Sequence, residues 1–225
     1  SQEFQQRRQS SPGLTHRDAR ILRTNIEAIE RMSVRKTMRP AALLPKPSQD
    51  PPEIYGVEAA YAVIRSFRFA EGGFFDDWAN QTSAAVVVLG ESAKVSLLGY
   101  EPALGKFIKV DGTWLQVIGV LEEQLAQNPR REGGATPDIN NVVYIPINTF
   151  EYRFQDPGGG LKDELAGVEL QLAEGADSIE VAKIVTTVLD STHRGTADFT
   201  VTIPAALLAQ QQRTQTIFTY VMVAI

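Results

Sequence analysis

The chain has 225 residues, of which 43% are apolar and 22% charged, as in an ordinary globular protein that forms one large domain or two small ones. Its 22 basic and 27 acidic residues give a net charge of −5. That balance argues against a globally basic nucleic-acid binder, because such binding needs clustered Lys and Arg. There are no cysteines, so disulfides, thiolate catalysis and cysteine-based zinc sites are excluded.

The first predicted element is a helix over residues 14–32, where apolar side chains recur every three or four positions. Thr15 and Asp18 resemble a capping box at its start, with Asp in place of the usual Glu. Basic residues follow between positions 31 and 39, and no aromatic side chain interleaves with them. We interpret them as a solvated helix end and not as a nucleic-acid patch.

The next segment is harder to assign. Residues 37–44 are predicted as a short strand, and residues 45–52, with four prolines, as a loop or a sheet edge. Residues 53–69 fit a short helix in their first part and a strand in their second, because the spacing of the apolar residues changes. The sequence EGG at residues 71–73 then ends the pattern.

The middle of the chain carries the clearest signals. Residues 84–89, AAVVVL, are typical of a strand buried on both faces, and residues 91–98 predict a short helix closed by a glycine. An Asp-Gly pair between residues 106–110 and 114–121 predicts a β-hairpin.

A polar segment separates this hairpin from the next strand. Residues 122–140 contain two prolines and a Gly-Gly pair, so we predict a mobile loop that is also a candidate partner contact. Residues 141–147 predict a strand, and Pro146 is expected to place the end of that strand at a sheet edge. The glycines at residues 158–160 mark the best internal boundary.

Beyond this boundary the pattern resembles a βαβ unit. Residues 168–172 alternate as a strand does, residues 176–189 predict a helix that begins at Asp177 or Ser178, and residues 199–203 predict a strand.

The chain ends in an apolar run, because residues 216–225 carry no charge. We interpret this run as the start of a membrane helix, and the alternative is an amphipathic helix docked on the core. Residues 205–225 as a whole are predicted as one continuous helix that acts as a stiff lever into the membrane, since neither Gly nor Pro interrupts them. No stretch reaches the roughly 18 consecutive apolar residues of a complete transmembrane helix.

No group of residues assembles a nucleophile, a base and a stabilising group. Ser92 follows a strand and a turn, but Lys94 stands where the nucleophile elbow has glycine. The glycines at residues 158–160 are not followed by Lys and Ser or Thr, as a phosphate loop would be. The chain is therefore predicted not to be an enzyme, and no catalytic, cofactor-binding or metal-ligating residue is assigned.

The remaining candidates are interpreted as structural. His193 is expected at a helix end, where the dipole favours a cation, and His16 has no second ligand one helical turn away. Adjacent carboxylates point to different faces of an element and are interpreted as surface charge: residues 76–77, 122–123 and 163–164. Aromatic side chains after Gly73 are interpreted as core anchors and not as a ligand-stacking site: Phe74, Phe75 and Trp78. The residues alone thus favour an α/β binding or transmission module next to a membrane.

Four segments carry a family resemblance. In chain order they are EGGFFDD (71–77), AAVVVLGESAKVSLLG (84–99), PALGKFIKVDGTWLQVIGVLEE (102–123) and NVVYIPI (141–147). Together they resemble the periplasmic core domain of MacB-like ABC transporter permeases, within the wider FtsX-like class. Some features depart from the family pattern. Gly73 follows another glycine, Leu98 stands where Phe is common, and the proline-rich segment 37–54 fits poorly. The first half-unit is also expected to lack the strand that the family places before its first helix.

The resemblance implies an α+β fold with two lobes. A porter-like βαβ lobe is expected from both chain ends, residues 1–70 and 161–214. A sabre-like α/β lobe, residues 71–160, is expected as an insert, and residues 215–225 as the start of a transmembrane helix.

The resemblance also implies a function. The chain is expected to be the extracytoplasmic domain of an ABC permease in the bacterial inner membrane, where it faces the periplasm or cell exterior and relays ATP-driven motion. Expected partners are an ABC ATPase subunit or domain, a periplasmic adaptor or exported substrate, the membrane, and a second copy in a homodimer; no cofactor and no nucleic acid are expected. The alternatives are a lipoprotein-release permease and a permease-like regulator of a cell-wall hydrolase.

Overall fold

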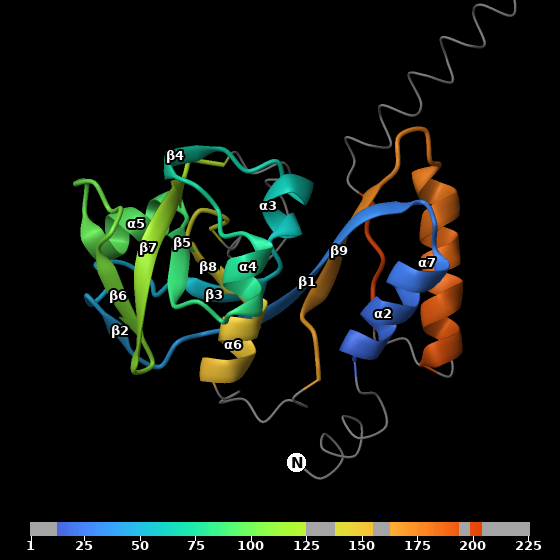
Figure 1. The fold of residues 1–225 in the computed structure, drawn as a ribbon, viewed down its shortest axis with the longest axis horizontal. Helices are drawn as coiled ribbons and strands as arrows, with labels where there is room; N and C mark the ends of the chain where they lie inside the picture. The colour runs from blue at the N-terminus through green and yellow to red at the C-terminus, as the bar shows by residue number, and fades with distance from the viewer. Residues whose placement is uncertain (1–12, 125–137, 155–162, 194–198, 204–225) are drawn as a thin grey trace, which may run out of the picture. The chain divides into compact units, whose positions relative to one another are not determined.

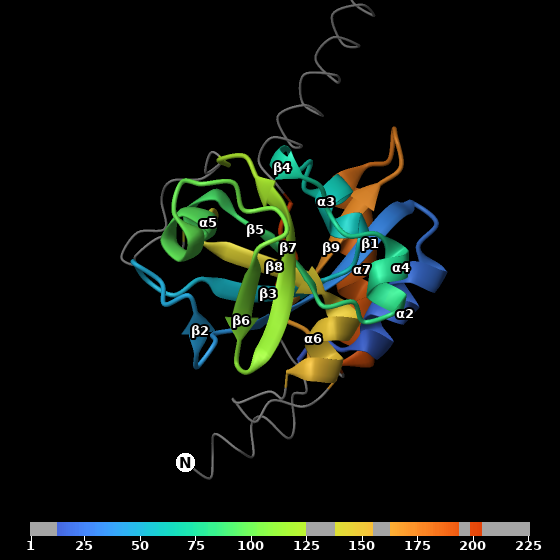
Figure 2. The ribbon, with the colours of Figure 1, turned by 60° about the vertical axis from the view of Figure 1, so that its left-hand side comes forward.

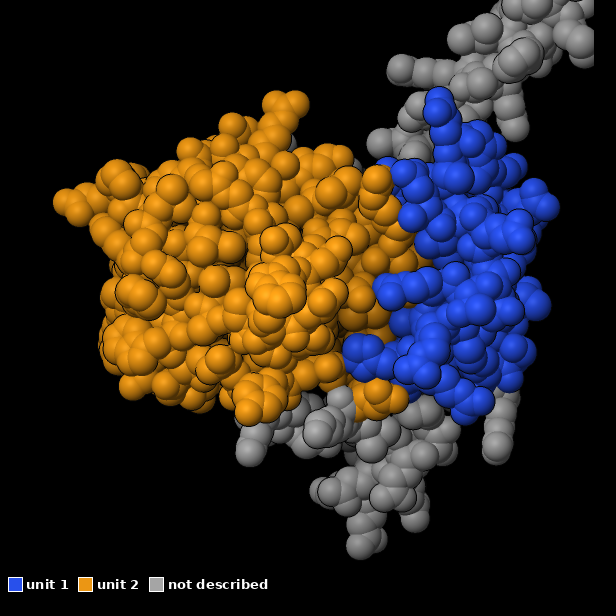
Figure 3. Space-filling view, in the orientation of Figure 1, with its two compact units in different colours: residues 1–30, 171–225 blue, residues 31–170 orange. Residues whose placement is uncertain are grey.

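The structure, a computed structural model, describes residues 13–124, 138–154, 163–193 and 199–203. The chain divides into two compact units (Figure 3). Unit 1 combines residues 1–30 with residues 171–225, so it is built from both chain ends, and unit 2 comprises residues 31–170. The lobe limits that the family resemblance implies, near residues 70 and 160, stay a prediction.

Within the described residues, nine strands form one mixed sheet in the order β2-β6-β7-β5-β8-β3-β1-β9, and β4 pairs with β7 beside this path (Figures 1 and 2). The pairs β3/β8 and β5/β7 are parallel. The strands are β1 (Ile29–Met38), β2 (Leu43–Leu44), β3 (Glu53–Val57), β4 (Phe69–Gly72), β5 (Val86–Leu89), β6 (Phe107–Val110), β7 (Thr113–Leu121), β8 (Val142–Pro146) and β9 (Gly167–Leu172).

The described helices are α2 (His16–Asn25), α3 (Ala60–Ile64), α4 (Asp77–Gln81), α5 (Glu91–Leu98), α6 (Ile147–Arg153) and α7 (Ser178–Thr192). In unit 2, α5 packs on β7 and β8, and α6 packs on β3 and β8. In unit 1, α2 packs on α7. These elements confirm the predicted α+β class.

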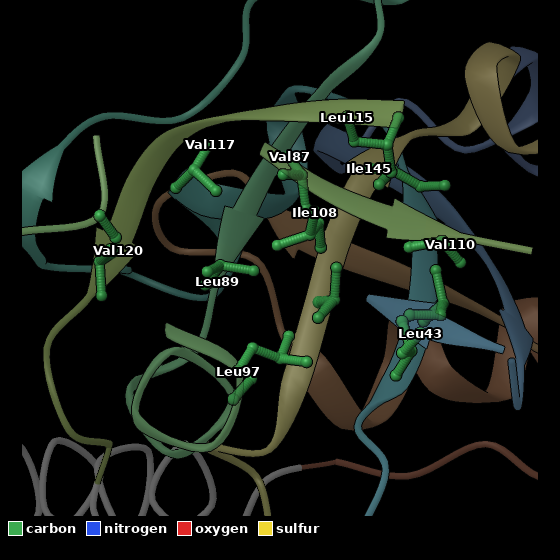
Figure 4. Packing of buried hydrophobic residues seen from close by; sticks show 14 of the residues in the cluster. Leu43, Val87, Leu89, Leu97, Ile108, Val110, Leu115, Val117, Val120 and Ile145 are labelled. Carbon is green, nitrogen blue, oxygen red and sulfur yellow. The ribbon is translucent and has the colours of Figure 1, made fainter. Parts of the chain in front are cut away.

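One face of the unit 2 sheet carries an aliphatic cluster (Figure 4). Alternate residues of each strand point to it, as strand geometry requires, and α5 and α6 cover it. Complete burial of such side chains contributes about 1.5–3 kcal/mol each. Its fully buried strand residues include Ile54, Val87, Leu89, Ile108, Val110, Leu115 and Ile145.

The other face carries an aromatic cluster. The Tyr144 ring lies 5.1 Å from the Phe67 ring and 5.9 Å from the Tyr61 ring, and Phe74 stacks on Phe75 at 4.1 Å. Such edge-to-face and offset pairs stabilise a core beyond the area that they bury. The members of the cluster are Tyr55, Tyr61, Phe67, Phe69, Phe74, Phe75 and Tyr144, with Val57, Val88, Leu121 and Val142 packed among them.

Two glycines allow β4 to lie close against β7. Gly72 pairs with Gly119 in the antiparallel ladder. A Cβ atom on Gly119 would lie 2.1 Å from the carbonyl oxygen of Gly73, and one on Gly72 would lie 2.1 Å from that of Ile118. The EGGFF segment and the VIGV segment are therefore brought together by backbone contact, which a side chain at either glycine would prevent.

The middle of the chain agrees with the sequence. The predicted buried strand is β5, the predicted helix over residues 91–98 is α5, and the hairpin is β6–β7. The capping box of Thr15 and Asp18 is also confirmed, as are β9 and the start of α7 at Ser178, with Asp177 as its N-cap.

The predicted helix over residues 14–32 is too long. Helix α2 ends at Asn25, and β1 begins at Ile29. Strand β1 lies between β3 and β9 in the sheet, and pairing with these strands overrides the helical spacing of residues 29–32. The basic residues there do not form a helix end, because most of them lie in β1. Of these, Arg35 lies 3.8 Å from Glu169 and Lys36 lies 3.1 Å from Glu151.

Three further expectations are corrected. The ambiguous residues 53–69 hold β3 and α3 and the first residue of β4. Pro146 does not mark a sheet edge, because β8 lies between β5 and β3; Pro146 is the last residue of the strand and the N-cap of α6. Residues 199–203 are described without strand hydrogen bonding, so the strand predicted there is wrong.

Several predictions lie outside the described residues: most of the loop at residues 122–140, the glycines at 158–160, and the helix at 205–225. Among the described helices, none is long and apolar enough to cross a membrane.

Candidate interaction surface

A sharp turn sets the geometry of the β6–β7 hairpin. Asp111 and Gly112 both adopt positive φ angles, 42° and 93°, as a two-residue hairpin turn that follows the twist of its strands requires. The register then places Ile108 opposite Leu115 and Lys109 opposite Trp114. Because opposed residues share a face, Ile108 and Leu115 enter the aliphatic cluster while Lys109 and Trp114 point the other way.

Strand β2 extends this outward face, since Leu44 is paired with Lys109. We call Leu44, Phe107, Lys109 and Trp114 the hairpin face. Its three apolar side chains are 52%, 53% and 55% exposed, in the order Leu44, Phe107 and Trp114. The Lys109 Nζ atom lies 5.5 Å from the centre of the Trp114 ring, within cation–π range.

Single exposed hydrophobic side chains are normal on a protein surface, but adjacent ones indicate a contact region. On the hairpin face, Leu44 and Trp114 flank Lys109 from the two neighbouring strands, and Phe107 lies two residues before Lys109 on the same face, so the hydrogen-bonded sheet fixes their spacing. Aromatic residues are also the type that dominates binding energy at protein interfaces. The arrangement suits contact with another macromolecule.

The connection between α5 and β6 exposes two more apolar side chains, Tyr100 at 87% and Leu104 at 47%. A half-buried charge holds the end of this connection: the Glu71 carboxylate accepts hydrogen bonds from the backbone N–H of Ala103 at 2.8 Å and of Leu104 at 3.4 Å. Its other oxygen lies 3.9 Å from Lys94 Nζ. The exposed side chains therefore stand on a fixed backbone.

The aromatic cluster does not offer acid–base chemistry at neutral pH. Burial raises the pKa of Tyr61 to about 12, and the nearby Glu169 carboxylate adds to this effect. Burial, with the neighbouring Tyr61 and Tyr55, raises the pKa of Tyr144 further. Both hydroxyls keep their protons, and their rings serve packing.

The residues that the sequence offered for chemistry have structural positions. Ser92 lies in the first turn of α5, as expected for a helix N-terminus. Asp76 caps α4 by accepting from the Ala79 N–H at 2.8 Å. Phe74 and Phe75 belong to the aromatic cluster, but Trp78 is 71% exposed, so its interpretation as a core anchor was wrong. No group of three or more potential metal ligands occurs within the described residues.

Sequence reasoning missed the hairpin face, although a signal was present. In β6 and β7, Ile108, Val110, Leu115 and Val117 alternate with the positions that face outward. Phe107 and Trp114 are aromatic at positions where alternation expects polar side chains. It also missed that His193 pairs with Asp18 of unit 1, because 175 positions of sequence separate the two.

The sequence profile of the MacB-like periplasmic core domain family matches residues 2–188. A macrolide export ATP-binding/permease protein MacB from Rhodospirillum rubrum is 31% identical over 176 residues, which are 76% of this chain and 25% of the relative. The MacB of Marinobacter nauticus is 28% identical over 76% of this chain and 24% of its own. The pyoverdine export ATP-binding/permease protein PvdT of Pseudomonas syringae pv. tomato is 29% identical over 71% of this chain and 23% of its own. The chain thus spans about a quarter of these relatives.

Two solved structures share the fold. The periplasmic region of MacB from Actinobacillus actinomycetemcomitans aligns with a TM-score of 0.67 at 20% identity, over 89% of this chain and 84% of that one. The extracellular domain of the noncanonic ABC-type transporter YknZ from Gram-positive bacteria aligns with a TM-score of 0.62 at 19% identity, over 85% and 90% of the two chains.

Proposed function

Because the chain belongs to the family of MacB-like periplasmic core domains, we propose that it is the extracytoplasmic part of an ABC export permease. In this role it carries conformational change, driven by ATP in the cytoplasm, to a partner or substrate outside the membrane. The export names of its relatives support this role and give no support to lipoprotein release or hydrolase regulation.

The proposal assigns ATP hydrolysis to another domain or subunit. The relatives that are named ATP-binding/permease proteins are about four times longer than the matched segment, which leaves room for that activity outside this chain. We accordingly propose a bacterial inner-membrane location with this domain facing the periplasm, and a homodimer in the full transporter.

Unit 1 is the part we propose to receive the motion. Its helices α2 and α7 adjoin the two chain ends in sequence, and they pack on one another. We propose that residues 205–225 act as a lever from the membrane. Insertion of Gly-Gly after Thr214 in the full transporter is then expected to abolish export while ATPase activity persists; normal export would refute the lever. The lobes at residues 1–70 with 161–214, and at 71–160, remain part of this proposal.

The single observation that carries the partner-binding role is the hairpin face. It groups Leu44, Phe107 and Trp114 on one rigid sheet surface, each about half exposed, around a lysine. Its burial against a periplasmic protein would remove apolar surface from water, and Trp and Phe anchors carry most of such energy.

The test replaces Phe107 and Trp114 together by alanine in the full transporter. Because both side chains are exposed, folding should be preserved while partner binding weakens by roughly 30-fold or more, the loss typical of interface anchors. Trp78→Ala is the matched control, since Trp78 is 71% exposed on α4, outside the hairpin face. Export that survives the double replacement, or falls equally in the control, would reject this surface.

A further inference from the structure

The two helices of unit 1 are joined by a small apolar contact. Helix α2 buries Ala19 and Leu22, and α7 buries Val181, Val185 and Leu189. At one end of this contact the apolar side chains are replaced by a titratable pair. Asp18 lies in the first turn of α2, and His193 is the C-cap residue of α7.

The pair is close and shielded from water. The His193 Nε2 atom lies 3.1 Å from Asp18 Oδ2, and the two side chains are 3% and 5% exposed. Both positions are fixed by backbone geometry. The backbone N–H of His193 donates to the Leu189 carbonyl at 2.9 Å, so the backbone of His193 is tied to the last turn of α7.

The same carboxylate is also part of the α2 capping box. Asp18 Oδ2 accepts from the Thr15 N–H at 2.9 Å and from the Thr15 hydroxyl at 2.6 Å. The Phe199 ring lies 5.6 Å from the His193 ring, centre to centre, in an edge-to-face arrangement. The groups that face the pair are thus Asp18 and Thr15 from the start of α2, Thr192 from α7, and Phe199.

These contacts favour the charged carboxylate. Burial alone would raise the pKa of Asp18, but the hydrogen bonds from Thr15, His193 and Thr192 outweigh it and lower the pKa below 3.8. Asp18 is therefore ionised throughout the range in which a histidine ordinarily gains or loses its charge, so the proton on His193 decides whether the pair is ionic.

We propose that Asp18 and His193 form a proton-operated latch in unit 1, which holds the start of α2 to the end of α7 while His193 is protonated and Asp18 is ionised.

The two states differ in a defined way. With His193 protonated, a charge-assisted hydrogen bond joins the helices in a site with little water, where such bonds are strongest. When His193 loses its second proton, Asp18 keeps its negative charge at a buried site, and its hydrogen-bond partners Thr15, Thr192 and the imidazole no longer supply an opposite charge. An uncompensated buried charge is costly, so the contact between the helices loosens.

The latch lies where it would matter for transmission. In sequence, α2 follows the N-terminal residues and His193 precedes the C-terminal ones, the two ends that the proposed function connects to the membrane. Only this consequence rests on the proposed function. The latch is a property of the isolated chain, and it adds a dependence on external pH that the family assignment does not contain.

The first experiment follows both histidine side chains by NMR while the pH of the 225-residue chain is varied. In Asp18→Asn, the titration midpoint of His193 should move to lower pH, because the carboxylate that favours its protonated form is gone. Asparagine retains the oxygen that accepts from Thr15, so the cap is preserved. His16, the other histidine of the chain, is followed in the same spectra, and the change at His193 should be the larger of the two. An unchanged midpoint for His193 would overturn the latch.

The second experiment needs no substitution at Asp18. Hydrogen-exchange protection of the α2 and α7 amides in the wild-type chain should fall as the pH rises through the His193 midpoint, while protection in β5 and β7 stays constant. His193→Gln keeps an N–H donor without a titratable charge and should abolish this dependence; His16→Gln should keep it. Protection in α2 and α7 that is indifferent to pH in the wild type would refute the proposal. Since neither experiment measures export, failure of the latch would leave the proposed function untouched.

Discussion

Unit 2 and the described part of unit 1 are stabilised in different ways. Unit 2 buries apolar side chains on both faces of its sheet, an aliphatic cluster on one and an aromatic cluster on the other. Unit 1 joins two helices through a short apolar contact and the buried titratable pair of Asp18 and His193. The packing of unit 2 depends on the shape and the buried area of its side chains, which pH does not change. The contact in unit 1 also depends on the protonation states of Asp18 and His193.

This difference suits the two proposed roles, partner binding by unit 2 and reception of motion by unit 1. A surface that binds a partner must keep its spacing, and the hairpin face stands on the fully buried Ile108, Val110 and Leu115. Unit 1, which we propose receives the motion, would need a contact whose strength can change. Substitutions in each unit test this difference.

The largest effect is expected from Leu115→Ala in unit 2. Leu115 is completely buried in the aliphatic cluster, so the change loses its transfer energy and leaves a cavity, and should lower the free energy of unfolding by about 2–5 kcal/mol. Trp114→Ala is the control, because Trp114 directly precedes Leu115 in the strand and points outward. This change should alter the free energy of unfolding by less than about 0.5 kcal/mol. Denaturant unfolding measures both, and equal losses would show that the two faces of β7 are not different.

A smaller loss, about 1–3 kcal/mol, is expected for Gly119→Ala. The new methyl group would lie 2.1 Å from the Gly73 carbonyl oxygen, so β4 must move away from β7. Gly73→Ala is the matched control, because a Cβ at that position meets nothing within 4 Å. Thermal unfolding should separate the two variants, and a stable Gly119→Ala would mean that β4 can shift freely.

In unit 1, Asp177→Ala should cost about 1 kcal/mol, because Asp177 caps α7 by accepting from the N–H groups of Ile179 at 2.8 Å and Glu180 at 3.2 Å. Asp190→Ala, near the other end of the same helix, should have little effect or stabilise slightly, since an anion there opposes the dipole. Faster hydrogen exchange confined to α7 in Asp177→Ala would support the prediction. Unchanged exchange of the α7 amides in that variant would contradict it.

The smallest effect is expected from acid, because it acts through one carboxyl group. The pKa of Asp18 is lower in the folded chain than its usual 3.8, so the stabilisation from this group is present above that value and is lost as the pH falls through the lowered pKa. The difference in unfolding free energy between the wild type and Asp18→Asn should shrink over this acid range. A difference that stays constant with pH would show that the charge of Asp18 is not what stabilises unit 1.

Much of the secondary structure could be predicted from short stretches of sequence. The capping box at Thr15 and Asp18, the Asp-Gly turn of the hairpin and the glycine after α5 each act over a few residues, so their outcome is local. The order of four segments also predicted the family, whose profile spans residues 2–188. From this resemblance follows the proposed role in an ABC export permease.

The remaining features depend on what lies beside a residue in space. Residues 29–32 have helical spacing but belong to a strand, Pro146 ends an interior strand, and Trp78 is exposed to water. In each case the packing of neighbouring elements sets the conformation or the exposure of the residue. The hairpin face exists only because β2 pairs with β6 and leaves Leu44 beside Lys109. The latch exists only because the fold brings Asp18 and His193 within 3.1 Å. Local turns, caps and buried strands follow from short stretches of sequence, since their energies arise within a few residues. Which distant side chains meet, and which face stays exposed, depends on how the elements pack.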